Sequence, residues 1–115
     1  MVAAPPSRGE VWEVDFGTPR DHEQGGRRPA LVVSANQLNR GQAELVIVVP
    51  LTTQPKGIRF HVKVDPPDGG LPRRSFVKPE DIRSVSVERL GRRLGSVSPQ
   101  ALETVGSRLR VLLDL

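Results

Sequence analysis

Short apolar segments recur along this chain, and most of them alternate with polar residues. Gly9–Phe16 changes from polar to apolar at nearly every second residue, which predicts a strand buried on one face. Glu44–Leu51 is almost continuously apolar, as is typical of a strand buried on both faces. The same reasoning predicts further strands at Pro29–Ser34, Phe60–Val64, Ser75–Lys78, Ile82–Val85 and Gly95–Val97. Pro66–Gly70 predicts a turn, Pro79–Asp81 a break between strands, and Ala35–Asn39 a helical turn.

The C-terminal segment changes to helical periodicity. Ser98 is placed to cap a helix and Pro99 suits its first turn. One face of this helix carries Leu102, Val105, Leu109, Leu112 and Leu113. Several short strands followed by one helix, without regular βαβ alternation, favour a mainly β (α+β) fold, a small twisted antiparallel barrel with a C-terminal helix and short helical insertions, over a doubly wound sheet. The 115 residues predict a single domain, 1–115, in which 1–6 form a flexible tail.

Charge and composition limit the partners and the kinds of site that this chain can have. The chain carries 17 Lys and Arg against 13 Asp and Glu, a net charge of +4, and residues 59–115 supply all of this excess. Such a balance is compatible with a polyanionic partner, although a solvated basic surface is an equal alternative. There is no cysteine, so a thiolate zinc site and a thiol nucleophile are excluded. With no signal-like or membrane-spanning apolar stretch, we expect a soluble cytoplasmic protein without membrane contact.

The most informative segment is the polar loop that enters the second strand. It runs from Asp21 through two glycines to Arg28 and Pro29. Proline restricts the residue before it to extended conformations, so Arg28 is held in place at the strand start. If this strand pairs with the one ending at Thr52, a guanidinium and a hydroxyl lie together. They suit RNA cleavage by the internal 2′-hydroxyl, which requires stabilisation of an anionic phosphorane and no metal.

Plainer interpretations stay open for the same residues. Arg28 is equally able to bond a local carboxylate, and Thr52 to cap a strand end. His22 has the side chain best suited to proton exchange near neutral pH, but a loop histidine is usually just solvated. His61, between Phe60 and Val62, is expected to be an exposed strand residue. No spacing typical of a metal site or a P-loop is present, and we expect neither metal nor cofactor.

Four blocks of sequence carry a family resemblance. They are Arg8–Asp15, His22–Val33, Val49–Thr53 and Ile82–Val85. In this order they resemble the MazF/PemK family of toxin endoribonucleases of type II toxin–antitoxin systems. The resemblance implies an SH3-like barrel with added helices, a homodimer, and metal-independent, sequence-specific cleavage of single-stranded RNA. It also implies products with a 2′,3′-cyclic phosphate and a 5′-hydroxyl.

The resemblance also implies residue roles. Arg28 would act as acid or phosphorane stabiliser, and Thr52 would orient the 2′-hydroxyl or the phosphate. His22 stands where relatives often have serine, so it is a candidate for catalytic support only. The implied RNA-binding residues are Glu23, Gln24, Arg27, Thr53, Gln54, Lys56 and Arg83. Asp81 stands where the family usually carries glutamine, so RNA contacts there are expected to differ.

Partners and alternatives complete the expectations. The family implies a cognate antitoxin whose acidic, initially disordered segment folds across the basic surface. Toxins with the same small barrel also poison DNA gyrase without cutting RNA, and a non-catalytic nucleic-acid-binding module is a third possibility. The Arg28–Thr52 pair favours the endoribonuclease over the gyrase poison, which has no need of it. RNA binding without cleavage would distinguish the non-catalytic module.

Overall fold

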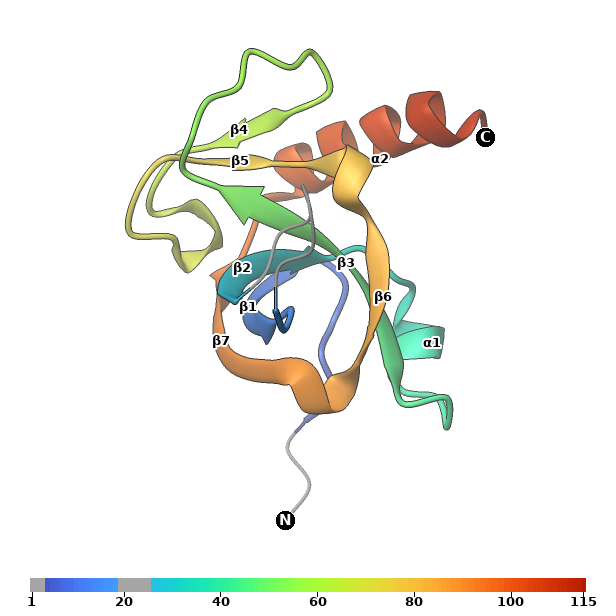
Figure 1. The fold of residues 1–115 in the computed structure, drawn as a ribbon. Helices are drawn as coiled ribbons and strands as arrows, with labels where there is room; N and C mark the ends of the chain where they lie inside the picture. Colours follow the sequence, from blue (N-terminus) through green and yellow to red (C-terminus); the bar gives the residue numbers. More distant parts are fainter. Residues whose placement is uncertain (1–3, 19–25) are drawn as a thin grey trace.

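The computed structural model describes residues 4–18 and 26–115, and within them it forms one curled antiparallel sheet and a C-terminal helix (Figure 1). The strands are β1 (Glu10–Asp15), β2 (Arg27–Val32), β3 (Leu45–Thr52), β4 (Val62–Val64), β5 (Ser75–Val77), β6 (Arg83–Ser86) and β7 (Leu90–Ser96). The helices are α1 (Asn36–Asn39), α2 (Pro99–Leu113) and the 3-10 helices η1 (Asp68–Gly70), η2 (Pro79–Asp81) and η3 (Val87–Arg89). The mainly β class with a C-terminal helix is thereby confirmed.

Strand β3 is the centre of the sheet, whose order is β4-β5-β3-β2-β1-β7. Along one edge β3 pairs with β2. Along the other it pairs first with β6, from Leu45 to Val48, and then with β5 at Leu51 and Thr52. A single eight-residue strand therefore holds three neighbours. The sheet curls but remains a half-barrel. It does not close, because in the described part of the chain the last strand, β7, pairs with β1 alone.

Successive side chains of β3 point alternately into two separate hydrophobic cores. Odd-numbered side chains, such as Val49 and Leu51, join a first core with Leu31, Val77 and Val105 of α2. Even-numbered side chains point to the opposite face. There a second core, inside the curl of the sheet, contains Val14, Phe16, Ala30, Val32, Val46, Val48 and Val85. The continuous apolar run of β3 is thus explained by burial on both faces.

Helix α2 covers the first core and is capped as the sequence predicts. The Ser98 hydroxyl accepts a hydrogen bond from the Ala101 N–H at 3.1 Å, and Pro99 follows the cap. Val105 is fully buried, and Leu102 and Leu109 pack against the first core. Leu113, on the same helical face as Leu102, is 49% exposed because it lies in the last turn of the helix.

Strand β7 is longer than the expected Gly95–Val97. Two sets of contacts hold it in place. The first is a close approach of η1 to β7. A Cβ on Gly70, whose φ is +67°, would lie 1.9 Å from the Leu94 carbonyl oxygen, and one on Gly95 would lie 2.7 Å from the Gly70 nitrogen. Only glycines allow the two backbones to meet in this way. The segment joining β4 to β5 is therefore held against the far edge of the sheet.

The second set of contacts is made by the carboxylate of Glu10 on β1. It accepts hydrogen bonds from the Ser7 N–H at 2.8 Å, the Trp12 indole at 3.0 Å and the Arg93 Nε at 2.8 Å. Burial by itself raises the pKa of Glu10, but these hydrogen bonds and the Arg93 charge outweigh burial and hold the pKa below its ordinary value of 4.5. This carboxylate links β1 to β7.

Candidate active site

The pairing of β2 with β3 brings Arg28 and Thr52 to the same level of the sheet. Their ladder ends at Ala30 opposite Pro50, and continuing this register by two residues on each strand sets Arg28 across from Thr52. Residues directly opposite in an antiparallel pair direct their side chains to one face. That face carries Ala30 and Val48 of the second core. Arg28 and Thr52 therefore mark the rim where this core opens.

The Thr52 hydroxyl is fixed by the turn that follows β3. The residue is 7% exposed, and its Oγ1 accepts a hydrogen bond from the Gln54 N–H at 3.1 Å. A hydroxyl that accepts from the backbone still has its own hydrogen to donate. The turn therefore leaves Thr52 able to act as a hydrogen-bond donor toward an anion.

The two neighbouring arginines of β2 point to different faces. Arg28 is exposed, opposite Val14 of β1, and the following Pro29 keeps it extended. Arg27 lies one residue earlier, so its side chain takes the other face. Its Nη1 lies beside Gly91 of β7, 3.4 Å from where a Cβ on that glycine would be. The structure therefore places Arg28, and not Arg27, on the face of Thr52.

The loop after β3 presents the other predicted contacts. Thr53, Gln54 and Lys56 are all exposed, and the Thr53 hydroxyl accepts a hydrogen bond from Arg73 Nη2 at 3.3 Å. Arg83 lies on β6 opposite Val48, with its guanidinium carbon 5.2 Å from the centre of the Phe16 ring. Arg83 thus lies against the second core, and Thr53, hydrogen-bonded to Arg73, directly follows Thr52. His22, Glu23 and Gln24 lie outside the described residues.

The expectation of an exposed His61 is wrong. Its side chain is only 4% exposed, and it precedes β4 instead of lying in it. Its Nε2 lies 2.6 Å from Glu80 Oε2 of η2, while the buried Nδ1 has no hydrogen-bond partner among the described atoms. Asp81 of η2 is held by Lys78 at 2.8 Å. The acidic residues of η2 are thus engaged with neighbouring side chains.

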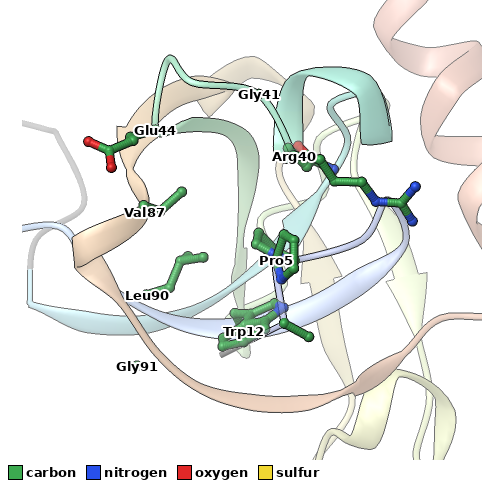
Figure 2. A pocket seen from close by; sticks show the side chains of 11 residues that line it. Pro5, Trp12, Arg40, Gly41, Glu44, Val87, Leu90 and Gly91 are labelled. Carbon is green, nitrogen blue, oxygen red and sulfur yellow. The ribbon is translucent and has the colours of Figure 1, made fainter. Parts of the chain in front are cut away.

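A partly open pocket lies elsewhere in the described part of the structure (Figure 2). It has a volume of about 390 Å³, and it lies between the N-terminal segment, α1 and η3, with Trp12, Val87 and Leu90 around it. None of the candidate residues that the structure describes lines it. The described candidate residues lie instead at the open rim of the sheet, which suits a long polymer.

Two further observations concern metals and membranes. Over residues 4–18 and 26–115, no group of three or more His, Asp and Glu side chains is arranged to hold a metal ion. No helix in that part of the chain is long and apolar enough to cross a membrane.

Comparison with known proteins identifies the family. Residues 7–113 match the family described as PemK-like, MazF-like toxin of type II toxin–antitoxin system. The chain is 36% identical to endoribonuclease MazF9 of Mycobacterium tuberculosis over 113 residues, which cover 94% of this chain and 96% of that protein. The crystal structure of MazF from Deinococcus radiodurans superposes with a TM-score of 0.85 at 30% identity, covering 98% of this chain and all of the other.

A further structural relative was solved with a partner. It is a mycobacterial endoribonuclease in complex with its cognate antitoxin, with a TM-score of 0.78 and 30% identity over 98% of this chain and 97% of that one. The family match over nearly the whole chain agrees with the four sequence blocks and with the curled sheet. This chain belongs to the PemK/MazF family of type II toxins.

Proposed function

We propose that this protein is a toxin endoribonuclease that cleaves single-stranded RNA, mRNA in the cell, at a defined base sequence and without a metal ion. The observation that carries the proposal is the pairing of Ala30 with Pro50, whose register, continued by two residues on each strand, sets Arg28 across from Thr52. The similarity to proteins named as endoribonucleases supports the same activity. Since mRNA is the proposed substrate, the proposed place of action is the cytoplasm.

The chemistry requires attack by an internal oxygen. The 2′-oxygen of one ribose attacks the adjacent phosphorus and loses its proton, while the P–O5′ bond breaks and the 5′-oxygen gains a proton. The products are a 2′,3′-cyclic phosphate and a 5′-hydroxyl. Negative charge builds up on the non-bridging phosphate oxygens in between. A fixed guanidinium is the side chain best suited to stabilise it, which is the proposed role of Arg28.

Thr52 is proposed to orient the phosphate. Its Oγ1 already accepts from the Gln54 N–H, so the hydroxyl hydrogen is available for a phosphate oxygen. His22 is proposed to assist proton transfer without being essential, because water can take over proton exchange from a single imidazole. His22→Ala should then cost about tenfold or less in rate. A loss equal to that of Arg28→Ala would make His22 the principal acid or base.

A cognate antitoxin is the proposed regulator. One structural relative was solved with its cognate antitoxin. This chain carries a net charge of +4, and the exposed cations Lys56, Arg73 and Arg83 lie in or around the candidate site. An acidic segment that is disordered when free gains charge complementarity by folding over such a surface. Its binding would cover the residues proposed to contact RNA.

A direct experiment tests the activity. The purified protein is incubated with a long unstructured RNA in excess EDTA, the cut sites are mapped by primer extension, and the product ends are analysed chemically. Cleavage at a recurring sequence, with cyclic-phosphate and 5′-hydroxyl ends, is expected. RNA binding without cleavage, or inhibition of DNA gyrase by intact protein that leaves RNA uncut, would overturn the proposal in favour of the other two classes.

A further inference from the structure

Strand pairing aligns Thr52 with one residue on β5 and one on β4. Thr52 on β3 lies directly opposite Phe76 on β5, and Phe76 lies directly opposite Lys63 on β4. Figure 1 shows these three strands side by side, above the curled part of the sheet. Opposite residues share a face. Thr52, Phe76 and Lys63 therefore form a continuous row of side chains, which we call the β5–β4 row.

The faces of β4 and β5 are fixed independently by their buried neighbours. Val62, Val64 and Val77 all point into the first core. Phe76 and Lys63 alternate with these valines along their strands, so they point away from that core. The row thus continues the open face on which Arg28 and Thr52 lie.

Packing in the two cores does not explain the aromatic side chain of Phe76. It is partly exposed, and it belongs to neither the first nor the second core. The chain contains only three phenylalanines and one tryptophan, and Phe16 and Trp12 are taken up by the second core. A ring lying beside the proposed catalytic threonine offers a flat apolar surface to a base.

Lys63 places a positive charge next to that ring. It is exposed, and within residues 4–18 and 26–115 it is paired with no carboxylate. Neighbouring strands lie about 4.8 Å apart, so Lys63 stands about 10 Å from Thr52 along the row. A nucleotide adjoining the cleaved bond can bridge this separation.

We propose that Phe76 and Lys63 form a nucleotide subsite beside Arg28 and Thr52. The base of a nucleotide flanking the cleaved bond stacks on the Phe76 ring, and Lys63 binds the phosphate of that nucleotide. This inference rests on the proposed endoribonuclease function and assigns a part of its substrate-binding surface. Stacking accepts any base, so the subsite contributes affinity and orientation, and hydrogen bonds elsewhere read the sequence.

A lysine on an edge strand also hinders unwanted strand pairing, and an aromatic side chain on a sheet also shields backbone. Both of those roles predict changes in solubility or stability alone. The test must therefore read out contact with RNA.

Stacking is tested with an uncleavable RNA that carries 2′-deoxyribose at the mapped cleavage position. The fluorescent base 2-aminopurine is placed in turn at each position flanking that bond. The wild-type protein should quench it at one position, Phe76→Leu should abolish the quenching, and Phe76→Tyr should retain it. On cleavable RNA, Phe76→Leu should lower kcat/KM about tenfold. Quenching and cleavage by Phe76→Leu equal to wild type would overturn the stacking role.

The phosphate contact is tested by salt dependence. Each phosphate contact to single-stranded nucleic acid contributes about 0.7 to the slope of log affinity against log salt. Lys63→Gln should lower the slope by about that amount, and Lys63→Arg should restore it. Arg40→Gln, which removes an exposed charge at the end of α1, is the matched control and should leave the slope unchanged. An unchanged slope in Lys63→Gln would remove Lys63 from the subsite.

Different results would contradict the proposed endoribonuclease function and the proposed subsite. Absence of RNA cleavage by the wild type would contradict the proposed function itself. Cleavage that depends on Arg28 and Thr52, but is unaffected by Phe76→Leu and Lys63→Gln, would contradict the subsite alone.

Discussion

Arg28 and Thr52 come to the same level of the sheet because Ala30 pairs with Pro50, two residues away from each of them. The relationship depends on backbone register, so it is preserved when either side chain is changed. We therefore predict that Arg28→Ala and Thr52→Ala each reduce RNA cleavage about 100- to 1000-fold, as expected for loss of a preorganised donor. Single-turnover rates measure this effect.

Matched variants separate chemistry from packing. Thr52→Ser keeps the hydroxyl and should cleave within a few-fold of wild type, whereas Thr52→Val keeps the shape and should be as slow as Thr52→Ala. Arg28→Lys should recover little, because an ammonium does not reproduce the guanidinium fork. Circular dichroism establishes that each variant is folded. Near wild-type cleavage by folded Arg28→Ala or Thr52→Val would show the site assignment to be wrong.

A second prediction concerns the buried contact between His61 and Glu80. The imidazole is 4% exposed and lies 2.6 Å from the carboxylate, so His61→Ala leaves a cavity as well as a broken hydrogen bond. We expect it to lower the free energy of unfolding by about 2 kcal/mol or more, and Glu80→Gln by about 1 kcal/mol. Urea denaturation measures both values.

The double variant provides the check on coupling. If the contact is the common cause, adding Glu80→Gln to His61→Ala should cost much less than Glu80→Gln costs alone. Full additivity of the two losses would mean that each residue acts through other neighbours.

Glu10 gives the fold a defined pH dependence. Its pKa in the folded protein lies below the ordinary value of 4.5, so the carboxylate contributes stability that is complete above this value. The contribution is lost as the pH falls through the folded-state pKa. The stability advantage of wild type over Glu10→Gln should therefore be greatest near neutral pH and shrink on acidification below pH 4.5. Urea midpoints at several pH values measure it. A difference independent of pH would exclude a charge effect.

Much of this fold was predictable because hydrophobic alternation is local information. The strand around Val11 and Val14, the buried strand β3 and the Ser98 cap are all set by neighbouring residues, and each was confirmed. The prediction that the first of these strands is buried on one face only was wrong, because Val11 joins the first core and Val14 the second. Strand β7 was largely missed since its middle, Gly91–Arg93, is exposed and polar and pairs with only one neighbour. The glycine contact between Gly70 and Gly95 fastens it, and that contact joins segments far apart in sequence.

The candidate site was predictable only where a residue carries its own signal. Arg28 before a proline and Thr52 at the end of an apolar run are visible in the sequence. Phe76 and Lys63 are not, because their nearness to Thr52 arises from the pairing of three strands. His61 was misjudged for the same reason: its partner, Glu80, comes from η2, and alternation along one strand does not predict such a contact.

The last prediction concerns the exposed apolar end of α2. Val111 is 68% exposed, Leu113 49% and Leu115 84%, while Val105 on the inner face is fully buried. A helix end with several exposed apolar side chains commonly marks a protein interface. We expect a homodimer at micromolar concentration, in which this end of α2 meets a second copy and the two open faces supply one longer RNA-binding surface. Sedimentation should give twice the monomer mass of 12.6 kDa.

Charge placed in this patch should oppose association. Val111→Asp combined with Leu113→Asp is expected to shift the protein toward monomer, whereas Gln100→Asp, at the exposed start of the same helix, serves as the control. If two chains bind one RNA, dissociation should weaken RNA affinity and make it less steeply dependent on salt, because fewer phosphates are neutralised in each complex. A wild-type protein that sediments as a 12.6 kDa monomer and still cleaves at full rate would show that one chain alone holds the complete site.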